Sequence, residues 1–159
     1  MTAFLRDAGP ADAADVARVY VESWNAGFVP LFPTRTLTDR DIERWSGDLA
    51  STSTRWRVAT ADGAVVGFAG TGPSRDPVQP RLGELDTIAV DPGRWRQGLG
   101  RLLMTDAVGA LARDFESAVL WTLRDYPDGH AFYLSTGWVR DPATRDRGRQ
   151  VAFRMTNLR

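Results

Sequence analysis

A short apolar strand that runs directly into a glycine turn and then a helix constrains this chain more than any other feature. Residues 88–90 form a β-branched and apolar run, and Asp91-Pro92 ends it, because proline cannot donate a ladder hydrogen bond. Glycine and arginine dominate the turn at 93–98, and an amphipathic helix begins at Gly98. This order brings unpaired N–H groups and the positive end of a helix to one place. We therefore predict an anion site that holds a pyrophosphate.

Two common nucleotide loops do not match this turn. A P-loop needs a lysine, and the chain contains none; a dinucleotide fingerprint needs a third glycine, which residues 101–103 do not supply. The segment instead resembles the pyrophosphate loop of the GNAT superfamily of N-acetyltransferases, Val-x-Pro-x-x-(Gln/Arg)-x-x-Gly-x-(Gly/Ala). Val90, Pro92, Gly98 and Gly100 match in register, whereas Trp95 stands where the family usually has Gln or Arg.

A second motif of the same family follows downstream, Asn-x-x-Ala-x-x-Phe-Tyr-x-x-x-Gly-(Phe/Trp). Its second half matches fully at residues 132–138. Its first half departs, since Tyr126 occupies the Asn position and Gly129 the Ala position. The contact that the family's Asn makes to the cofactor is therefore not carried over unchanged. Together the two motifs and the N-terminal pattern extend the resemblance over nearly the whole chain.

The composition limits the classes of function. The 159 residues, of which 43% are hydrophobic and 25% charged, suit a single soluble domain over 1–159. We expect a cytoplasmic protein with no membrane partner, because the chain has no long apolar run and no signal pattern. Twenty basic residues balance twenty acidic ones, which does not favour nucleic acid. The chain has no cysteine and one histidine, so we expect no disulfide, no cysteinyl acyl-enzyme and no metal.

Hydrophobic periodicity and turn residues predict the following elements. We expect strands at 4–6, 56–60, 65–69, 85–90 and 117–123, with Asp62-Gly63 as a hairpin turn, and a closing hairpin of 138–139 with 151–156. We expect a first helix from Pro10 to about Trp24 and a second that begins at a capping box formed by Thr38 and Asp41. A third helix is expected at 98–113, and its core-facing residues are Leu99, Leu102, Leu103, Ala110 and Leu111. A fourth is expected at 128–136, with Asp128 as its cap. Pro30 and Pro33, the proline-containing segment 71–82 and the charged segment 140–150 are expected to be loops.

Strands that alternate with helices before a terminal hairpin predict an α/β fold: a mixed, mostly antiparallel central sheet of about 6–7 strands with helices on both faces. This agrees with the GNAT fold. The resemblance implies that the pantetheine arm of acetyl-CoA lies between the central strand and the next one, and that a backbone N–H near Ile88 donates to the oxyanion. The cofactor-binding residues that it implies are Ile88, Ala89, Val90, Arg96, Gln97, Gly98, Leu99, Gly100, Arg101 and Tyr126.

Tyr133 and Glu84 are the candidates for the proton chemistry. Tyr133 matches the family's Tyr, which protonates or hydrogen-bonds the leaving thiolate; the alternative is a packed Tyr. Glu84 lies where some members carry a base, and strand alternation places Asp86 on the same face, where both carboxylates would attract a cationic amine. A solvated charge at the end of a strand is the alternative for Glu84. His130 is expected to be a surface or capping residue.

The acceptor site is expected from the first two helices. Segment 23–28 resembles the aromatic acceptor loop of small-molecule members, and Trp24 and Phe28 are four residues apart, so that they line a pocket or pack in the core. Glu22 and Asn25 are candidates for polar contacts. By analogy with family members, the terminal hairpin is a candidate homodimer surface.

The sequence thus predicts an N-acetyltransferase that transfers an acetyl group from acetyl-CoA to a primary amine by direct attack in a ternary complex. A small-molecule acceptor comes first, and a protein N-terminus or lysine second. A longer acyl-CoA donor, a non-catalytic acyl-CoA sensor and a nucleotide-binding α/β domain are the alternatives. The sequence does not identify the acceptor, the acyl chain or the oligomeric state.

Overall fold

Seven strands form a mixed β-sheet in the order β1-β2-β3-β4-β5-β7-β6. β4 and β5 pair in parallel, whereas the β1–β2, β5–β7 and β6–β7 pairs are antiparallel. The computed structural model describes residues 2–28, 31–75 and 78–159, and over these it contains four α-helices and two 3-10 helices. The mixed α/β architecture predicted from the sequence is confirmed. The chain divides into two compact units, and β3, β4 and α3 each contribute residues to both.

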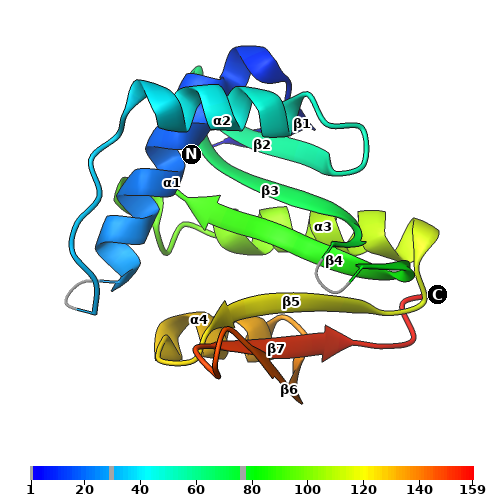
Figure 1. Cartoon of the computed structure of the whole chain (residues 1–159). Coiled ribbons are helices and arrows are strands. Elements are labelled where there is room, and N and C mark those ends of the chain that lie inside the picture. Colours follow the sequence, from blue (N-terminus) through cyan, green and yellow to red (C-terminus); the bar gives the residue numbers. More distant parts are fainter. Residues whose placement is uncertain (1, 29–30, 76–77) are drawn as a thin grey trace. The chain divides into compact units, whose positions relative to one another are not determined.

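The first unit comprises the residues up to Gly70 together with Thr87–Met104. Its elements are β1 (Ala3–Asp7), η1 (Pro10–Asp12), α1 (Ala13–Phe28), α2 (Asp39–Leu49), β2 (Arg55–Ala61), the first part of β3 (Ala64–Arg75), the last part of β4 (Val78–Val90), η2 (Pro92–Arg94) and the start of α3 (Leu99–Asp114). Figure 1 shows α1 and α2, in blue and cyan, next to each other, and the two helices are in contact. The predicted first helix is therefore confirmed but extends one turn beyond Trp24, to Phe28.

Local signals in the sequence explain the start of α2 and the β2–β3 hairpin. Thr38 is the N-cap of α2; its hydroxyl accepts from the Asp41 N–H at 3.2 Å, and the Asp41 carboxylate accepts from the Thr38 N–H at 2.9 Å. Asp62 and Gly63 both have positive φ, as a tight hairpin turn requires. The predicted capping box and hairpin are thus confirmed.

A hydrophobic cluster lies at the centre of the elements of the first unit. It joins α1, α2, β2, β3 and the end of β4 through Ala13, Val16, Ala17, Val19, Trp45, Leu49, Trp56, Val58, Val65, Phe68 and Ala89. The rings of Trp45, Trp56 and Phe68 meet edge to face or tilted, with centroids 5.2–6.2 Å apart. Such aromatic contacts add to the free energy that burial alone contributes.

The second unit comprises Thr71–Asp86 and Thr105–Arg159. Besides the ends of β3, β4 and α3 it contains β5 (Ala118–Leu123), α4 (Pro127–Ser135), β6 (Val139–Arg145) and β7 (Gln150–Met155). β7, red in Figure 1, lies between β5 and β6, with Leu120 opposite Phe153 in the β5–β7 register. Leu82, Val119 and Ala152 form a buried cluster in this unit. The predicted strand 117–123 and helix 128–136 are confirmed to within one residue at each end.

The prediction of a loop over 71–82 is wrong. Residues 71–75 continue β3 and residues 78–82 begin β4, so these two strands form a much longer hairpin than expected. Proline removes only the ladder hydrogen bond at its own position, and Pro73 and Pro80 lie near the hairpin end of their strands, where that loss is tolerated. Pro30 and Pro77 lie outside the described residues.

The prediction of a charged loop over 140–150 is also wrong. Most of this segment is β6, which pairs with β7 and contains a bulge between Asp141 and Thr144, around Pro142. The Asp141 carboxylate accepts from the Ala143 N–H at 2.8 Å inside that bulge. β6 is the last strand in the sheet order, and edge strands characteristically carry charged residues, proline and bulges. The charge pattern was therefore that of an edge strand.

Helix α3 confirms its predicted range but not all of its predicted core residues. Leu99, Leu103, Ala110 and Leu111 are buried, whereas Leu102 is 38% exposed. The buried positions follow the spacing of one helix face, and Leu102 lies off that face. Within the described residues no helix has the length and hydrophobicity that a membrane span requires.

Candidate active site

The glycine turn of the first unit begins with a tightly tied entry from β4. The Asp91 N–H donates to the Val66 carbonyl at 2.8 Å, which holds the end of β4 against β3. The Asp91 side chain then caps η2 by accepting from the Gly93 N–H at 3.0 Å. Pro92 occupies the first position of this short helix, where a missing N–H costs nothing. The turn thus leaves β4 in a defined direction.

Two residues of the turn have left-handed backbone conformations. Gly98 has φ of 84°, which suits glycine, and Arg96 has φ of 63°, which is costly for a residue with a Cβ. The Leu102 N–H donates to the Gly98 carbonyl at 3.0 Å, so the N–H groups of residues 99–101 precede the first bond of the helix. Arg96, Gln97 and Gly98 are exposed beside them. A turn of this kind presents backbone donors to an anion.

Trp95, the residue that departs from the family pattern, folds back on the strand that precedes the turn. Its indole N–H donates to the Val90 carbonyl at 2.8 Å, while 41% of the residue stays exposed. Trp95 thereby ties the first half of the turn to the last residue of β4, Val90. The departure gives the turn an additional internal hydrogen bond.

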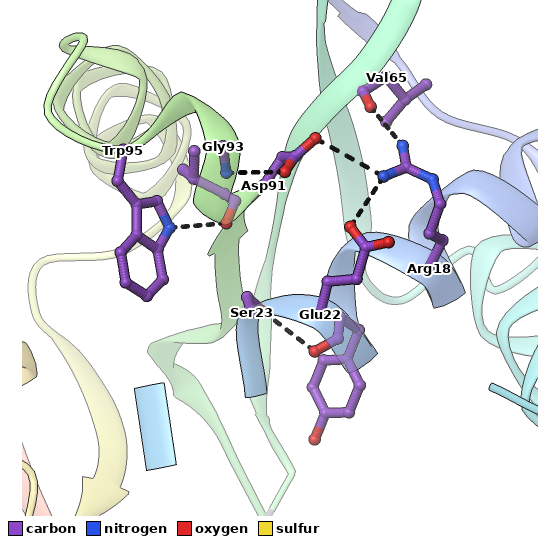
Figure 2. A network of polar contacts seen from close by, with 9 residues as sticks. Arg18, Glu22, Ser23, Val65, Asp91, Gly93 and Trp95 are labelled. Atoms are coloured by element: carbon purple, nitrogen blue, oxygen red, sulfur yellow. Dashed lines mark hydrogen bonds and ion pairs between the residues drawn. The ribbon is translucent and has the colours of Figure 1, made fainter. Parts of the chain in front are cut away.

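Arg18 connects α1 to the start of the glycine turn, a contact that the sequence did not predict. Figure 2 shows its guanidinium between the Glu22 carboxylate, the Asp91 carboxylate and the Val65 carbonyl. The respective distances are 3.1, 3.6 and 3.0 Å. Glu22, expected to contact the acceptor, is engaged by Arg18 instead. Asp91 therefore connects the turn to α1 as well as capping η2.

The aromatic residues at the end of α1 form a cluster with a cation above it. Trp24 and Phe28 meet edge to face at 4.5 Å, and Trp24 lies 5.7 Å from Phe32, which is 39% exposed. The Arg35 guanidinium lies 4.0 Å above the Trp24 ring. The Asn25 amide fixes Arg35 by accepting from its N–H at 2.6 Å and donating to its carbonyl at 2.9 Å. The predicted Trp24–Phe28 contact is confirmed. Asn25, a candidate for polar contacts with the acceptor, instead hydrogen-bonds the backbone of Arg35 in the segment after α1.

In the second unit, β4 carries the two predicted carboxylates. Glu84 is 8% exposed, and its Oε1 accepts from the Arg75 N–H at 3.0 Å. Burial raises the pKa of Glu84, with a smaller contribution from the negative charge of Asp86, while the hydrogen bond from Arg75 opposes the increase. Asp86 forms an ion pair with the Arg75 guanidinium. Since Glu84 is buried in the middle of β4, a solvated charge at the end of a strand is excluded.

Tyr133 lies on α4, and the end of that helix explains the spacing of the second motif. The Trp138 N–H donates to the Tyr133 carbonyl at 3.0 Å and the Gly137 N–H to the Leu134 carbonyl at 3.3 Å, which is a Schellman C-cap. Gly137 has φ of 100°, and Trp138 is buried. The Phe-Tyr-x-x-x-Gly-Trp pattern therefore terminates this helix at a fixed distance after Tyr133.

The ring of Tyr133 packs on Phe153 of β7, with the centroids 5.6 Å apart. Burial raises the pKa of the Tyr133 phenol to about 12, and a hydrogen bond with Thr122 on β5 acts in the opposite direction. The phenol is therefore neutral and able to donate a hydrogen bond at physiological pH. After burial, the electrostatic interaction with Tyr126 is the next contribution that raises this pKa, and it exceeds the opposing effect of Thr122.

The two departures in the second motif compensate each other. A Cβ added to Gly129 would lie 2.3 and 2.4 Å from two carbons of the Tyr126 ring. The ring therefore occupies the space that alanine would need. Tyr126, rather than Asp128, is the N-cap of α4, because Pro127 at the first helical position starts the helix one residue earlier than predicted.

His130 has a structural position. Its Nε2 lies 2.8 Å from the Leu123 carbonyl at the end of β5, and its ring meets Phe153 at 5.2 Å. The residue is half-buried, and its ring nitrogen contacts the last carbonyl of β5. The contact attaches α4 to β5 and β7.

Sequence reasoning missed the arginines that hold the candidate residues. Arg18 pairs with Asp91 at the start of the turn, Arg35 lies over Trp24, and Arg75 donates to Glu84. In each pair the arginine comes from a different segment of the chain than its partner. The pairing of Tyr126 with Gly129 did leave a signal, because two neighbouring positions of one motif depart together.

Comparison with known proteins identifies the family. The model of the acetyltransferase (GNAT) family matches residues 16–138. A Bacillus subtilis (strain 168) protein named uncharacterized N-acetyltransferase YuaI is 32% identical over 126 residues, which cover 77% of this chain and 73% of that protein.

Solved structures share the fold. The PaiA N-acetyltransferase of Thermoplasma acidophilum, solved in complex with coenzyme A, superposes with a TM-score of 0.76 at 17% identity and covers 98% of this chain and 99% of its own. A putative GNAT acetyltransferase of Desulfovibrio desulfuricans gives 0.77 at 25% identity with the same coverage. The glycine turn, the Tyr133 motif and these matches agree: the chain belongs to the GNAT family of N-acetyltransferases, which use acetyl-CoA.

Proposed function

We propose that this N-acetyltransferase transfers the acetyl group of acetyl-CoA to a primary amine of a small molecule by direct attack. The observation that carries the proposal is Glu84, a carboxylate that is buried within a strand and whose pKa is raised by that burial. A raised pKa makes a carboxylate a better proton acceptor, and an amine nucleophile must lose a proton. The chain has no cysteine to form an acyl-enzyme, which leaves direct attack.

The glycine turn is assigned to the diphosphate of acetyl-CoA. The support is its left-handed backbone at Arg96 and Gly98 and the helix start that follows, with the side chains of Arg96 and Arg101 supplying positive charge. Ile88, Ala89 and Val90 are assigned to the pantetheine arm through their backbone groups, although Trp95 already occupies the Val90 carbonyl. Tyr126 stands at the motif position whose Asn contacts the cofactor in other members.

Tyr133 is assigned to the leaving thiolate as a hydrogen-bond donor. Its pKa of about 12 lies about 3.5 above that of an ordinary thiol, about 8.5, so complete proton transfer to the thiolate would cost about 5 kcal/mol. A hydrogen bond stabilises the developing charge without that cost. The raised pKa thus favours donation over protonation, two roles that the sequence alone left open.

In the proposed reaction Glu84 accepts the proton that the amine loses. The nitrogen–carbon bond forms as the carbon–sulfur bond breaks, and coenzyme A leaves as a thiolate that takes up a proton from solvent. An alkylammonium has a pKa of about 10.4, so the higher pKa of a buried carboxylate reduces the unfavourable difference between donor and acceptor. Starting from an alkylammonium, the nitrogen loses two protons on the way to the amide, one to Glu84 before attack and one to solvent after it, and the thiolate takes one up. The net products are therefore an amide, coenzyme A and one proton.

A small acceptor with an apolar part is supported by the aromatic cluster at the end of α1. Phe32 is partly exposed beside Trp24 and Phe28, and aromatic rings provide contact area at a low cost in conformational entropy. Arg35 above Trp24 adds a positive charge there, which favours an acceptor that also carries an anionic group.

The test is release of the coenzyme A thiol from acetyl-CoA in the presence of amines, amino acids, polyamines, aminoglycosides and lysine-containing peptides. The protein has no thiol of its own, so background is low. We expect release with one class of small amine. Tyr133→Phe should reduce kcat at least about tenfold with little change in acetyl-CoA affinity. Release only with peptides would indicate a protein acetyltransferase, and tight acetyl-CoA binding without any release would indicate a sensor.

A further inference from the structure

One residue of the second unit contacts both carboxylates of β4. The backbone N–H of Arg75, on β3, donates to Oε1 of Glu84 at 3.0 Å. The guanidinium of the same residue forms the ion pair with Asp86. Glu84 and Asp86 are two positions apart on one strand, so their side chains lie on the same face of it. Arg75 therefore reaches both acids from the neighbouring strand, with its main chain for one and its side chain for the other.

The two acids differ in environment because of this arrangement. Glu84 is buried and receives a neutral backbone donor, whereas Asp86 receives a full positive charge. The charged groups that act on Glu84 are Asp86 on its own strand, Arg75 on β3 and Arg145 on β6. Arg145 lies 4.4 Å over the Trp121 ring and hydrogen-bonds Gln150. Pairing with Arg75 offsets the negative charge of Asp86 next to Glu84.

From this geometry we infer that Arg75 is the positioning residue of the proposed base: it orients Glu84 through its backbone amide and neutralises Asp86, so that Glu84 alone takes the proton of the amine. This inference rests on the proposed function of Glu84. It also changes the role of Asp86, which the sequence suggested as an attractant for a cationic amine. In the structure the positive charge that Asp86 attracts is that of Arg75.

Two single substitutions predict changes of opposite sign in the pH profile. Arg75→Met keeps the backbone donor but removes the positive charge that Arg75 places beside Asp86, so the acid limb of the kcat/KM profile should move to higher pH. Asp86→Asn leaves the Arg75 charge uncompensated, so the acid limb should move to lower pH. When the limb moves by about one pH unit, kcat/KM at a fixed pH on it changes about tenfold, because the profile follows the ionised fraction of the base.

The double variant Arg75→Met/Asp86→Asn removes both charges and should return the acid limb close to that of the wild type. A merely structural defect would not be corrected by a second substitution, and this makes the double variant the decisive measurement. Arg81→Met is the matched control. Arg81 is an exposed arginine on β4, the strand that carries Glu84 and Asp86, and its loss should leave the acid limb in place. Circular dichroism and urea unfolding of each variant establish that it is folded.

Acid limbs that coincide in all variants, or that move in the same direction in both single variants, would overturn the inference. Glu84→Gln separates this failure from failure of the proposed function. If Glu84→Gln removes the acid limb while the Arg75 and Asp86 variants leave it unmoved, only the role of Arg75 is refuted. If Glu84→Gln keeps wild-type activity and profile, Glu84 is not the base and both proposals fail.

Discussion

The contact between Tyr126 and Gly129 predicts that Gly129→Ala destabilises the protein when Tyr126 is present and stabilises it when Tyr126 is replaced by alanine. In Gly129→Ala the new Cβ would lie 2.3 Å from a ring carbon of Tyr126, a separation that side chains do not adopt. Gly129 is within α4 and has an ordinary helical backbone, so alanine itself fits the main chain. The conflict is therefore with Tyr126 alone, and it disappears when the ring is removed.

The magnitude follows from two opposing contributions. Alanine stabilises a helix interior by about 1 kcal/mol relative to glycine. Overpacking a buried position costs about 1–3 kcal/mol, because the ring must move off its preferred position. We expect Gly129→Ala to lower the free energy of unfolding by up to about 2 kcal/mol in the wild type and to raise it by up to about 1 kcal/mol in Tyr126→Ala. The coupling energy is then about 1–3 kcal/mol.

The assay is urea unfolding of the wild type, the two single variants and the double variant, analysed as a double-mutant cycle. Equal effects of Gly129→Ala in both backgrounds would refute the reasoning, since they would mean that the ring moves aside freely. Acetyl-CoA affinity of the same four proteins adds an independent readout, because the ring stands at the family's cofactor-contacting position. We expect Gly129→Ala to weaken binding only when Tyr126 is present.

Three further outcomes are expected. Because φ is 84° at Gly98, Gly98→Ala should raise the KM for acetyl-CoA several-fold and lower the free energy of unfolding in urea by about 1 kcal/mol. Gly109 has open space around it, so Gly109→Ala should stabilise α3. Equal effects of the two substitutions would contradict the assignment of the turn. The pKa of Tyr133 is about 12 in the folded state and 10.0 in the unfolded state, so about 2–3 kcal/mol of stability is present below pH 10 and is lost as the pH rises to 12. The wild type should therefore lose this free energy of unfolding between pH 10 and pH 12, whereas Tyr133→Phe should not. The folded pKa of Glu84 is raised above 4.5, so its ionisation destabilises the fold as pH rises through that raised value; Glu84→Gln should gain stability over the wild type at neutral pH and lose this advantage below pH 4.5, as thermal melts at both pH values would show.

The two wrong loop predictions share one physical origin. Proline and charge were interpreted as loop signals at 71–82 and 140–150, yet both segments are strands at a hairpin end or at a sheet edge. Such positions tolerate proline because they need fewer ladder hydrogen bonds, and they carry charge because one side faces water. Local composition cannot distinguish an edge strand from a loop, since the difference is the partner strand.

By itself the sequence determined what depends on local backbone chemistry. The sequence determined the glycine turn before α3, the capping box of α2, the Asp62-Gly63 hairpin and the C-cap of α4 at Gly137. All four follow from local conformations that few residues adopt. These features identify the family and locate Tyr133. Only the tertiary structure decided the environment of each reactive group, because pKa values depend on burial and on charges that come from other elements. It placed Glu84 in the interior, paired Asp86 on β4 with Arg75 on β3, and attached the turn to Arg18 on α1. None of these three features depends on neighbours in the sequence alone.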